Sequence, residues 1–275
     1  MNGHQNTATS GGDHPPANDR IGKTVAIIDL GDFAGQPSAR YGHQPYALRS
    51  LGDCPVFHRM ARRLSDCMLI DEIFVVGSNV PAHVLTRGVP GVQTCVLPSV
   101  HPCERMAAAL DQSGADWVAY TPANRPFIDA ELVDQLVAAA NDATADYVGF
   151  ASDDENVTRL ESLGLTAELI HGDAIRRLRR NSDRLPKVVD RCILSWLGEA
   201  PGAYHLKFVP LPTALDRADL RFAIEAEDDW DQTQVLGESV TRPDSQWSDL
   251  TSLMAYHPEL CESMARRNRR TETAC

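Results

Sequence analysis

Residues 24–31, with the sequence TVAIIDLG, place a short apolar run directly before an aspartate and a glycine. A run of this length that ends in turn-forming residues is typical of a strand buried on both faces of a sheet. Similar runs follow further along the chain. They occupy residues 73–76, 94–97, 117–120 and 147–150. We therefore expect five strands in the first half of the chain, the first of which leads at Asp29 into a long loop.

Segments with helical patterns separate these runs. Residues 55–64 begin with a proline, which suits a first helical turn, and place apolar side chains on one face. Residues 102–110 and 129–140 read the same way, with Asp129 as an N-cap, and residues 81–86 are a short candidate helix. Alternation of strands and helices predicts an α/β fold whose mostly parallel sheet carries helices on both faces.

The second half of the chain adds further elements and suggests a domain division. We expect strands at 165–170, 208–211 and 220–224, and helices at 173–180 and 227–236. Residues 1–22 lack the apolar content of a core and are expected to be a disordered tail. Residues 23–240 form the main domain, in which 160–215 are a small β insertion that closes the site or makes a dimer contact. Residues 241–275 form a helical tail, with arginines at 266–270 in solvent.

Composition narrows the class of protein. The formal net charge of −12 argues against a nucleic-acid or anionic-membrane binder, and no apolar run is long enough for a membrane helix. The seven cysteines form no C-x-x-C pair, and the histidines show no H-x-x-x-H spacing, so neither a disulfide framework nor a classical metal motif is indicated. No leader segment is recognisable, and we expect a cytoplasmic protein.

Ligands of open α/β sheets bind beyond the carboxyl ends of the strands, which points to the loops 29–53, 77–80 and 121–129. Short patterns within and around these loops occur in a characteristic order. They are IIDLGDFAGQPSAR (27–40), LGDCPV (51–56), DEIFVVGS (71–78), ER (104–105), PFID (126–129), GLTAE (164–168) and LRFAIEAEDDW (220–230). Their order and spacing over residues 24–240 resemble the cytidylyltransferase-like proteins of surface-sugar biosynthesis, which include the spore-coat polysaccharide biosynthesis protein F group and the CMP-Kdo and CMP-sialate synthetases.

The resemblance implies a nucleotide-diphospho-sugar transferase (GT-A-like) fold and a transfer of a nucleotide, CMP above all, from an NTP to a sugar with release of pyrophosphate. Because charge builds on phosphate oxygens in such a reaction, the site needs cations and Mg²⁺. The implied phosphate-binding catalytic residues are Arg40 and Arg49, and the implied Mg²⁺ ligands are Asn124 and Glu225. The implied nucleotide-binding residues are Asp29, Leu30, Gly31, Ser38, Gly77 and Ser78, and the implied sugar-binding residues are Arg125 and Glu168.

The sequence departs from the family pattern at three of these places. Asn124 stands where the family has an aspartate, Glu225 replaces a second aspartate, and the lysine of the first loop is missing. Arginine clamps phosphate bidentately but is not equivalent to lysine. These departures favour an alternative function, a catalytically silent relative that binds a nucleotide or a partner enzyme. A glycosyltransferase on the same fold is a third reading, but residues 117–130 contain no D-x-D pair. A homodimer is possible in each case.

Each of these predicted site residues also has a purely structural explanation. Arg40 is otherwise a solvated loop arginine, and Asn124 otherwise closes an Asx turn before Arg125. Glu225 is otherwise an exposed acid, and Glu168 otherwise pairs with an arginine for structural reasons. The turns at 29–31 and 77–78 either end their strands or present backbone to the nucleobase.

Overall fold

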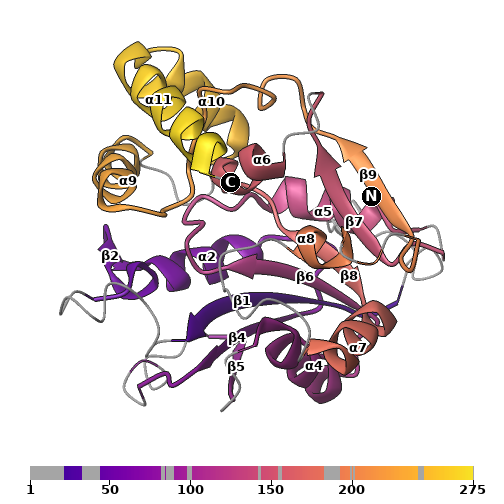
Figure 1. The fold of residues 1–275 in the computed structure, drawn as a ribbon. Helices are drawn as coiled ribbons and strands as arrows, with labels where there is room; N and C mark the ends of the chain where they lie inside the picture. Colours follow the sequence, from indigo (N-terminus) through magenta and orange to yellow (C-terminus); the bar gives the residue numbers. More distant parts are fainter. Residues whose placement is uncertain are drawn as a thin grey trace, which may run out of the picture.

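The computed structural model describes residues 22–32, 44–81, 84, 90–97, 101–141, 144–153, 157–182, 193–198, 200, 202–240 and 245–274. Within these residues, seven strands form one sheet in the order β5–β4–β1–β6–β8–β7–β9 (Figure 1). The strands are β1 (Thr24–Asp32), β4 (Glu72–Ser78), β5 (Val92–Val96), β6 (Trp117–Pro122), β7 (Tyr147–Ala151), β8 (Glu168–His171) and β9 (Leu206–Pro210). Neighbours pair in parallel except at β8, which is antiparallel to both β6 and β7. The expected mostly parallel α/β sheet is confirmed.

Helices cover both faces of this sheet. They are α2 (Val56–Leu64), α4 (Pro102–Ser113), α5 (Ala130–Ala139), α6 (Val157–Leu163), α7 (Gly172–Arg180), α8 (Ile193–Gly198), α9 (Glu227–Ser239), α10 (Trp247–Met254) and α11 (Pro258–Ala274). A 3₁₀ turn (Tyr46–Leu48) and the short pair β2 (Ser50–Leu51) and β3 (Cys54–Pro55) precede α2. None of the helices that the structure describes is long and apolar enough to cross a bilayer.

Strand β1 supplies side chains to two separate cores. Val25 and Ile27 pack with α4, α7 and α8, whereas Ala26, Ile28 and Leu30 pack with α2 and α5. All five side chains are at most 2% exposed. Successive residues of a strand point to opposite faces, so an unbroken apolar run is needed where both faces are covered. In Figure 1, α4 and α7 lie together on one side of β1, and α10 and α11 lie on the other.

The second half of the chain joins the main sheet instead of forming a small β element of its own. Strands β8 and β9, which fall within 160–215, pair with β6 and β7 of the seven-stranded sheet. The role of 160–215 in closing the site or in a dimer stays a prediction. Residues 1–21 lie outside the described residues, as do most of 81–86, the short candidate helix.

The strand expected at 220–224 is not part of the sheet. Its backbone bonds instead to the end of α6 and to a turn: Phe222 and Ala223 donate to the carbonyl of Ser162, at 3.1 Å each, and Ile224 donates to that of Asn124 at 2.9 Å. This close approach requires a glycine at 164, where φ is +68° and an added Cβ would lie 2.4 Å from the Ala223 nitrogen. Apolar composition predicted a strand, but these residues form an irregular segment that bends at Ala223.

The C-terminal helices belong to the core. Leu250, Met254, Cys261 and Met264 are buried in the same core as α2 and α5. Among the arginines of 266–270, Arg266 is exposed as expected, whereas Arg267 is half-buried and the neighbouring Asn268 is 3% exposed. Helix α11 therefore contributes apolar burial and a buried polar side chain, so it is not a solvated tail along its whole length.

We predict that Met264→Ala lowers the free energy of unfolding by about 2–5 kcal/mol, because it removes a fully buried side chain and leaves a cavity. Arg266→Ala, on the exposed side of the same helix, should change it by less than about 0.5 kcal/mol. Urea unfolding followed by circular dichroism measures both. Equal, small losses would show that α11 is not part of the cooperative core.

Candidate functional site

Three parallel strands, β1, β4 and β6, end side by side at one edge of the sheet. Asp29 is in register with Val76 of β4 and Pro122 of β6, and the pairing continues with Asp32 opposite Ser78. The backbone N–H of Ala123 donates to the carbonyl of Asp29 at 2.9 Å. The carboxyl ends of the three strands therefore lie side by side, which is the place that the sequence pattern predicted for a ligand.

The carboxylate of Asp29 is at the centre of a buried polar cluster at this edge. It accepts from Nε and Nη2 of Arg105 at 2.8 and 2.7 Å, and from the hydroxyl of Tyr120 at 2.9 Å. It also accepts from the N–H of Gly31, where φ is +72°. Arg105 is fully buried and Asp29 is 4% exposed. The Asp29 side chain thus holds the bulged end of β1 at 30–32.

Burial and charge together set the protonation of this cluster. Burial opposes the charge on Arg105, but the adjacent Asp29 outweighs it and raises the pKa of the guanidinium. Burial, together with the charge of Asp29, raises the pKa of Tyr120 well above its ordinary value. Arginine and tyrosine therefore remain protonated donors to the carboxylate across the physiological pH range.

The turn after β4 closes against the end of β1. Asp32 accepts from the Ser78 hydroxyl at 3.3 Å and from the Asn79 amide at 2.7 Å, and Asn79 has a φ of +52°. Gly77 sits where an added Cβ would lie 2.6 Å from Val80. Neither Asp32 nor Asn79 was singled out in the sequence. Their positions could have pointed to them, because Asp32 directly follows Gly31 and Asn79 directly follows Ser78, two residues that the sequence did suggest.

Asn124 and Glu225, the two implied metal ligands, are brought together although they are 101 positions apart in the sequence. Ile224, which precedes Glu225, donates its N–H to the Asn124 carbonyl at 2.9 Å and accepts from the Asn124 amide at 3.3 Å. The Asn124 Oδ1 is buried and has no hydrogen-bond partner among the described residues. An orphaned buried oxygen, bonded through its residue to the neighbour of a carboxylate that is 35% exposed, is compatible with a hard cation, which takes oxygen ligands.

Such a cation would have few ligands from the protein. Among the described residues, no group of three or more histidine, cysteine, aspartate or glutamate side chains is placed to hold a metal. Mg²⁺ at nucleotide sites is commonly held by one or two protein oxygens, with phosphate and water completing the octahedron. The pair Asn124 and Glu225 therefore suits a cation that arrives with a nucleotide better than a resident structural metal.

Arg49 lies at the outer side of this edge. Its guanidinium forms a bidentate pair with Glu227, at 2.6 and 2.7 Å, and lies 4.5 Å above the ring of Tyr46 and 5.5 Å from that of Trp230. The hydrogen bonds that Arg49 donates to the Glu227 carboxylate raise the pKa of the guanidinium. Because Glu227 is two residues beyond Glu225, Arg49 lies on the side of the molecule that carries the implied metal ligand. Arg40 and Ser38 lie outside the described residues.

Glu168 and Arg125, the implied sugar-binding residues, are both buried. Glu168 accepts from the Tyr147 hydroxyl at 3.0 Å and from the N–H groups of Ile193 and Leu194 at 3.1 Å each, the first residues of α8. Burial raises the pKa of Glu168, although the nearby Arg125 acts in the opposite direction. Arg125 donates to the Thr166 carbonyl at 2.5 Å. These contacts give both side chains a structural use, and their contact with a sugar stays a prediction.

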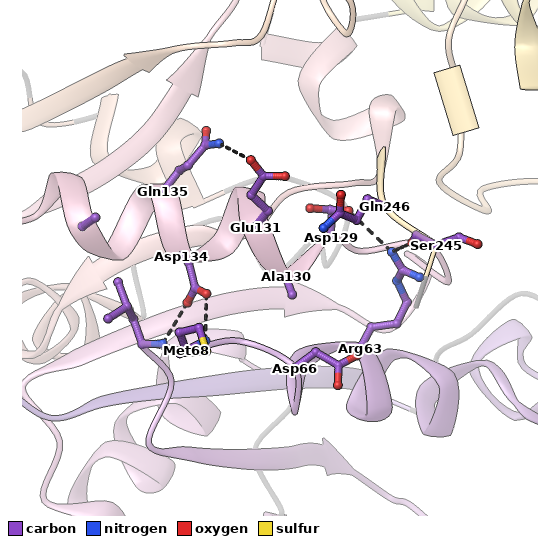
Figure 2. A pocket seen from close by; sticks show the side chains of 12 residues that line it. Arg63, Asp66, Met68, Asp129, Ala130, Glu131, Asp134, Gln135, Ser245 and Gln246 are labelled. Carbon is purple, nitrogen blue, oxygen red and sulfur yellow. Dashed lines mark hydrogen bonds and ion pairs between the residues drawn. The ribbon is translucent and has the colours of Figure 1, made fainter. Parts of the chain in front are cut away.

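A separate pocket of about 740 Å³ opens between the end of α2 and the start of α5 (Figure 2). Asp129 caps α5 through the Leu132 N–H and faces Arg63 at 3.6 Å. Asp134 accepts from the N–H groups of Met68 and Leu69 at 2.7 and 2.9 Å. Two of the pocket's acidic side chains therefore hold the α2–β4 connection and the α10 entry in place, away from Asn124 and Glu225.

Comparison with known proteins identifies a family for this chain. The profile of the MobA-like NTP transferase domain family matches residues 33–228. The chain is 22% identical over 137 residues to the spore coat polysaccharide biosynthesis protein SpsF of Bacillus subtilis (strain 168), covering 50% of this chain and 53% of that protein. It is 26% identical over 123 residues to the molybdenum cofactor guanylyltransferase of Yersinia pseudotuberculosis serotype O:1b (strain IP 31758), covering 45% and 60%. The chain thus spans about half to three fifths of these curated relatives.

A solved structure shares the fold across most of the chain. The cytidylyltransferase from Leptospira borgpetersenii serovar Hardjo-bovis (strain JB197) superposes with a TM-score of 0.68, covering 87% of this chain and 95% of that one. The two sequences are 14% identical. The likeness supports the α/β fold expected from the sequence.

We predict that Arg105→Met lowers the free energy of unfolding by about 3–5 kcal/mol, because it leaves the Asp29 carboxylate buried without its counter-ion. The double variant Asp29→Asn/Arg105→Met should recover part of this loss, since it buries no charge. Arg179→Met, which breaks the exposed pair with Asp111, is the control and should cost about 1 kcal/mol or less. Chemical denaturation of the four proteins measures these differences. Equal losses for Arg105→Met and Arg179→Met would contradict the central role of the Asp29 cluster.

Proposed function

Because this chain belongs to the MobA-like NTP transferase domain family, we propose that it transfers a nucleoside monophosphate from CTP to a hydroxyl group of a sugar. The pairing of Asn124 with the backbone next to Glu225, at the edge where β1, β4 and β6 end, carries the proposal. The SpsF relative and the family resemblance support a sugar acceptor in surface-polysaccharide synthesis. The guanylyltransferase relative makes GTP the competing donor.

The proposed reaction is a displacement at the α-phosphorus. The acceptor oxygen forms a bond to that phosphorus, the bond to the bridging α–β oxygen breaks, and pyrophosphate leaves with the bonding electrons. The proton of the acceptor hydroxyl passes to solvent. Negative charge grows on the phosphate oxygens along this path, so a site that holds fixed positive groups against them lowers the barrier.

In this proposal, different residues bind the nucleobase, the phosphates and the cation. Two strand ends would present backbone to the nucleobase. They are the end of β1 at 30–32, which Asp29 holds, and the end of β4 at Gly77–Ser78. Arg49 supplies a guanidinium near the phosphates, with Arg40 as its expected partner. Asn124 and Glu225 would hold Mg²⁺ through their oxygens. The cation, when bound with the triphosphate, would neutralise phosphate charge and orient the α-phosphoryl group.

We predict that Glu225→Gln and Asn124→Ala each lower the rate of pyrophosphate release by roughly 100-fold, because each removes a proposed oxygen ligand that acts where charge develops. Asp228→Asn, an exposed carboxylate three residues after Glu225, is the matched control and should keep its rate within about twofold. The assay uses the full chain with Mg²⁺, each of the four NTPs and a panel of sugars. Release with GTP alone would replace CTP as the donor. Wild-type silence across the panel would support the non-catalytic alternative.

CTP should raise the melting temperature of the full chain, and the rise should be larger with Mg²⁺ than without it. A ligand at 100 times its Kd stabilises the folded state by about 2.7 kcal/mol, which a thermal-shift assay detects readily. The Glu225→Gln variant should lose the added effect of Mg²⁺ and keep the effect of CTP alone. Equal shifts with and without the cation in the wild type would refute the assignment of Glu225 and Asn124 to a metal.

A further inference from the structure

Helix α11 reaches the backbone segment that carries Glu225, although the helix lies beyond the residues that match the family. The family match ends at residue 228, and α11 begins at Pro258. In Figure 1 this helix lies against α6. Residues 220–226 have no place in the sheet, so their position depends on contacts with such neighbours. Some of those contacts reach Glu225 and set the position of its side chain.

Asn268 is the residue of α11 that faces this segment. It is 3% exposed, and its amide donates to the carbonyls of Ala218 and Leu220 at 2.9 and 3.0 Å. Its Oδ1 accepts from Nη1 of Arg221 at 3.2 Å. One neutral side chain therefore fixes the backbone that enters the segment and the guanidinium that projects from it.

Arg221 passes that restraint to Glu225. It is 5% exposed and donates to the Glu225 Oε2 at 2.5 Å, to both oxygens of Asp229, and to the Ser162 hydroxyl at 2.9 Å. Burial opposes its charge, but the hydrogen bonds with Asp229 and Glu225 outweigh it and raise the pKa of Arg221. Glu225 Oε1 has no hydrogen-bond partner among the residues that the structure describes, so one carboxylate oxygen is held and the other is open.

Asp229 completes the arrangement. Its Oδ2 accepts from the N–H groups of Glu225 and Ala226 at 2.9 and 3.0 Å, which fixes the backbone at the start of α9. Arg267 of α11 pairs with the same carboxylate at 3.0 Å. The segment is therefore held through two carboxylates and two guanidinium groups, one of which comes from α11.

We propose that Asn268 is a positioning residue for Glu225: by holding Arg221, it sets the open carboxylate oxygen beside Asn124 and so controls the affinity for a divalent cation. The inference rests on the proposed function, in which Glu225 and Asn124 bind that cation. It makes α11, which the family profile does not include, a working part of the cation site. Residues that orient metal ligands from behind typically change metal affinity by about 10–100-fold when they are removed.

The test is Mn²⁺ binding by the full chain in the presence of CTP, followed by the electron paramagnetic resonance signal of free Mn²⁺. Asn268→Ala changes no charge, so a weaker affinity reports on position and not on the field at the site. We expect about tenfold weaker binding. Ser162→Ala removes a second neutral partner of Arg221, which comes from α6, and should weaken binding in the same direction. The double variant should lose less than the product of the two effects, because both act through Arg221.

Three control variants separate position from general loosening. Glu225→Gln should weaken Mn²⁺ binding more than either variant above. Met264→Ala destabilises α11 one helical turn before Asn268 and removes no hydrogen bond or ion pair of Arg221, so it should keep Mn²⁺ affinity within about twofold, as should the exposed Arg266→Ala. All measurements are made well below the melting temperature of the least stable variant. If Asn268→Ala does not fold, Ser162→Ala carries the same test.

The outcomes distinguish the inference from the function beneath it. Unchanged affinity in Asn268→Ala and Ser162→Ala, with weaker binding in Glu225→Gln, overturns the positioning role and leaves the cation site standing. An equal loss in Met264→Ala also overturns it, because loosening of α11 would then be enough. Unchanged affinity in Glu225→Gln, or no Mn²⁺ binding by the wild type, overturns both the positioning role and the proposed cation site.

Discussion

The buried ion pair between Asp29 and Arg105 is the interaction on which the architecture of the functional edge depends. Taking two charges out of water costs several kcal/mol per ion, and only good geometry with further hydrogen bonds offsets that cost. Here the two-pronged guanidinium, the Tyr120 hydroxyl and the Gly31 N–H all converge on one carboxylate. Together with Tyr120, the pair joins β1, β6 and α4 near the carboxyl ends of the strands, so the protein's own side chains hold these strand ends together.

A second constraint shapes the other side of the site. The backbone of 220–226 leaves the sheet, and buried N–H and C=O groups outside a sheet need other partners. They find them in the last residues of α6, in Asn124 and in the amide of Asn268. The glycine at 164 permits the approach that these bonds require. Asn124 thus pairs with the segment that carries Glu225 because the buried backbone groups of that segment need hydrogen-bond partners, as well as because of its side-chain amide.

The sequence predicted the elements of the sheet well and the partners of its polar side chains poorly. Apolar runs identified the strands from 24 to 151 because burial on both faces leaves a local signal. The pairing of Asp29 with Arg105 leaves none, since 76 positions separate the two residues and either charge alone suggests solvent or a ligand. Residues 220–224 have the composition of a strand, but composition does not say whether a strand or a loop accepts the bonds. The Asn124–Glu225 pair was expected from family resemblance, and the carboxylates and arginines behind it were not.

The ion pair between Arg49 and Glu227 has a consequence for the binding of anions at the site. The guanidinium of Arg49 contacts the rings of Tyr46 and Trp230 and already holds a bidentate carboxylate. That carboxylate is 58% exposed, and an exposed ion pair contributes about 1 kcal/mol or less. If Arg49 binds phosphate as proposed, a triphosphate would exchange with Glu227 at little cost.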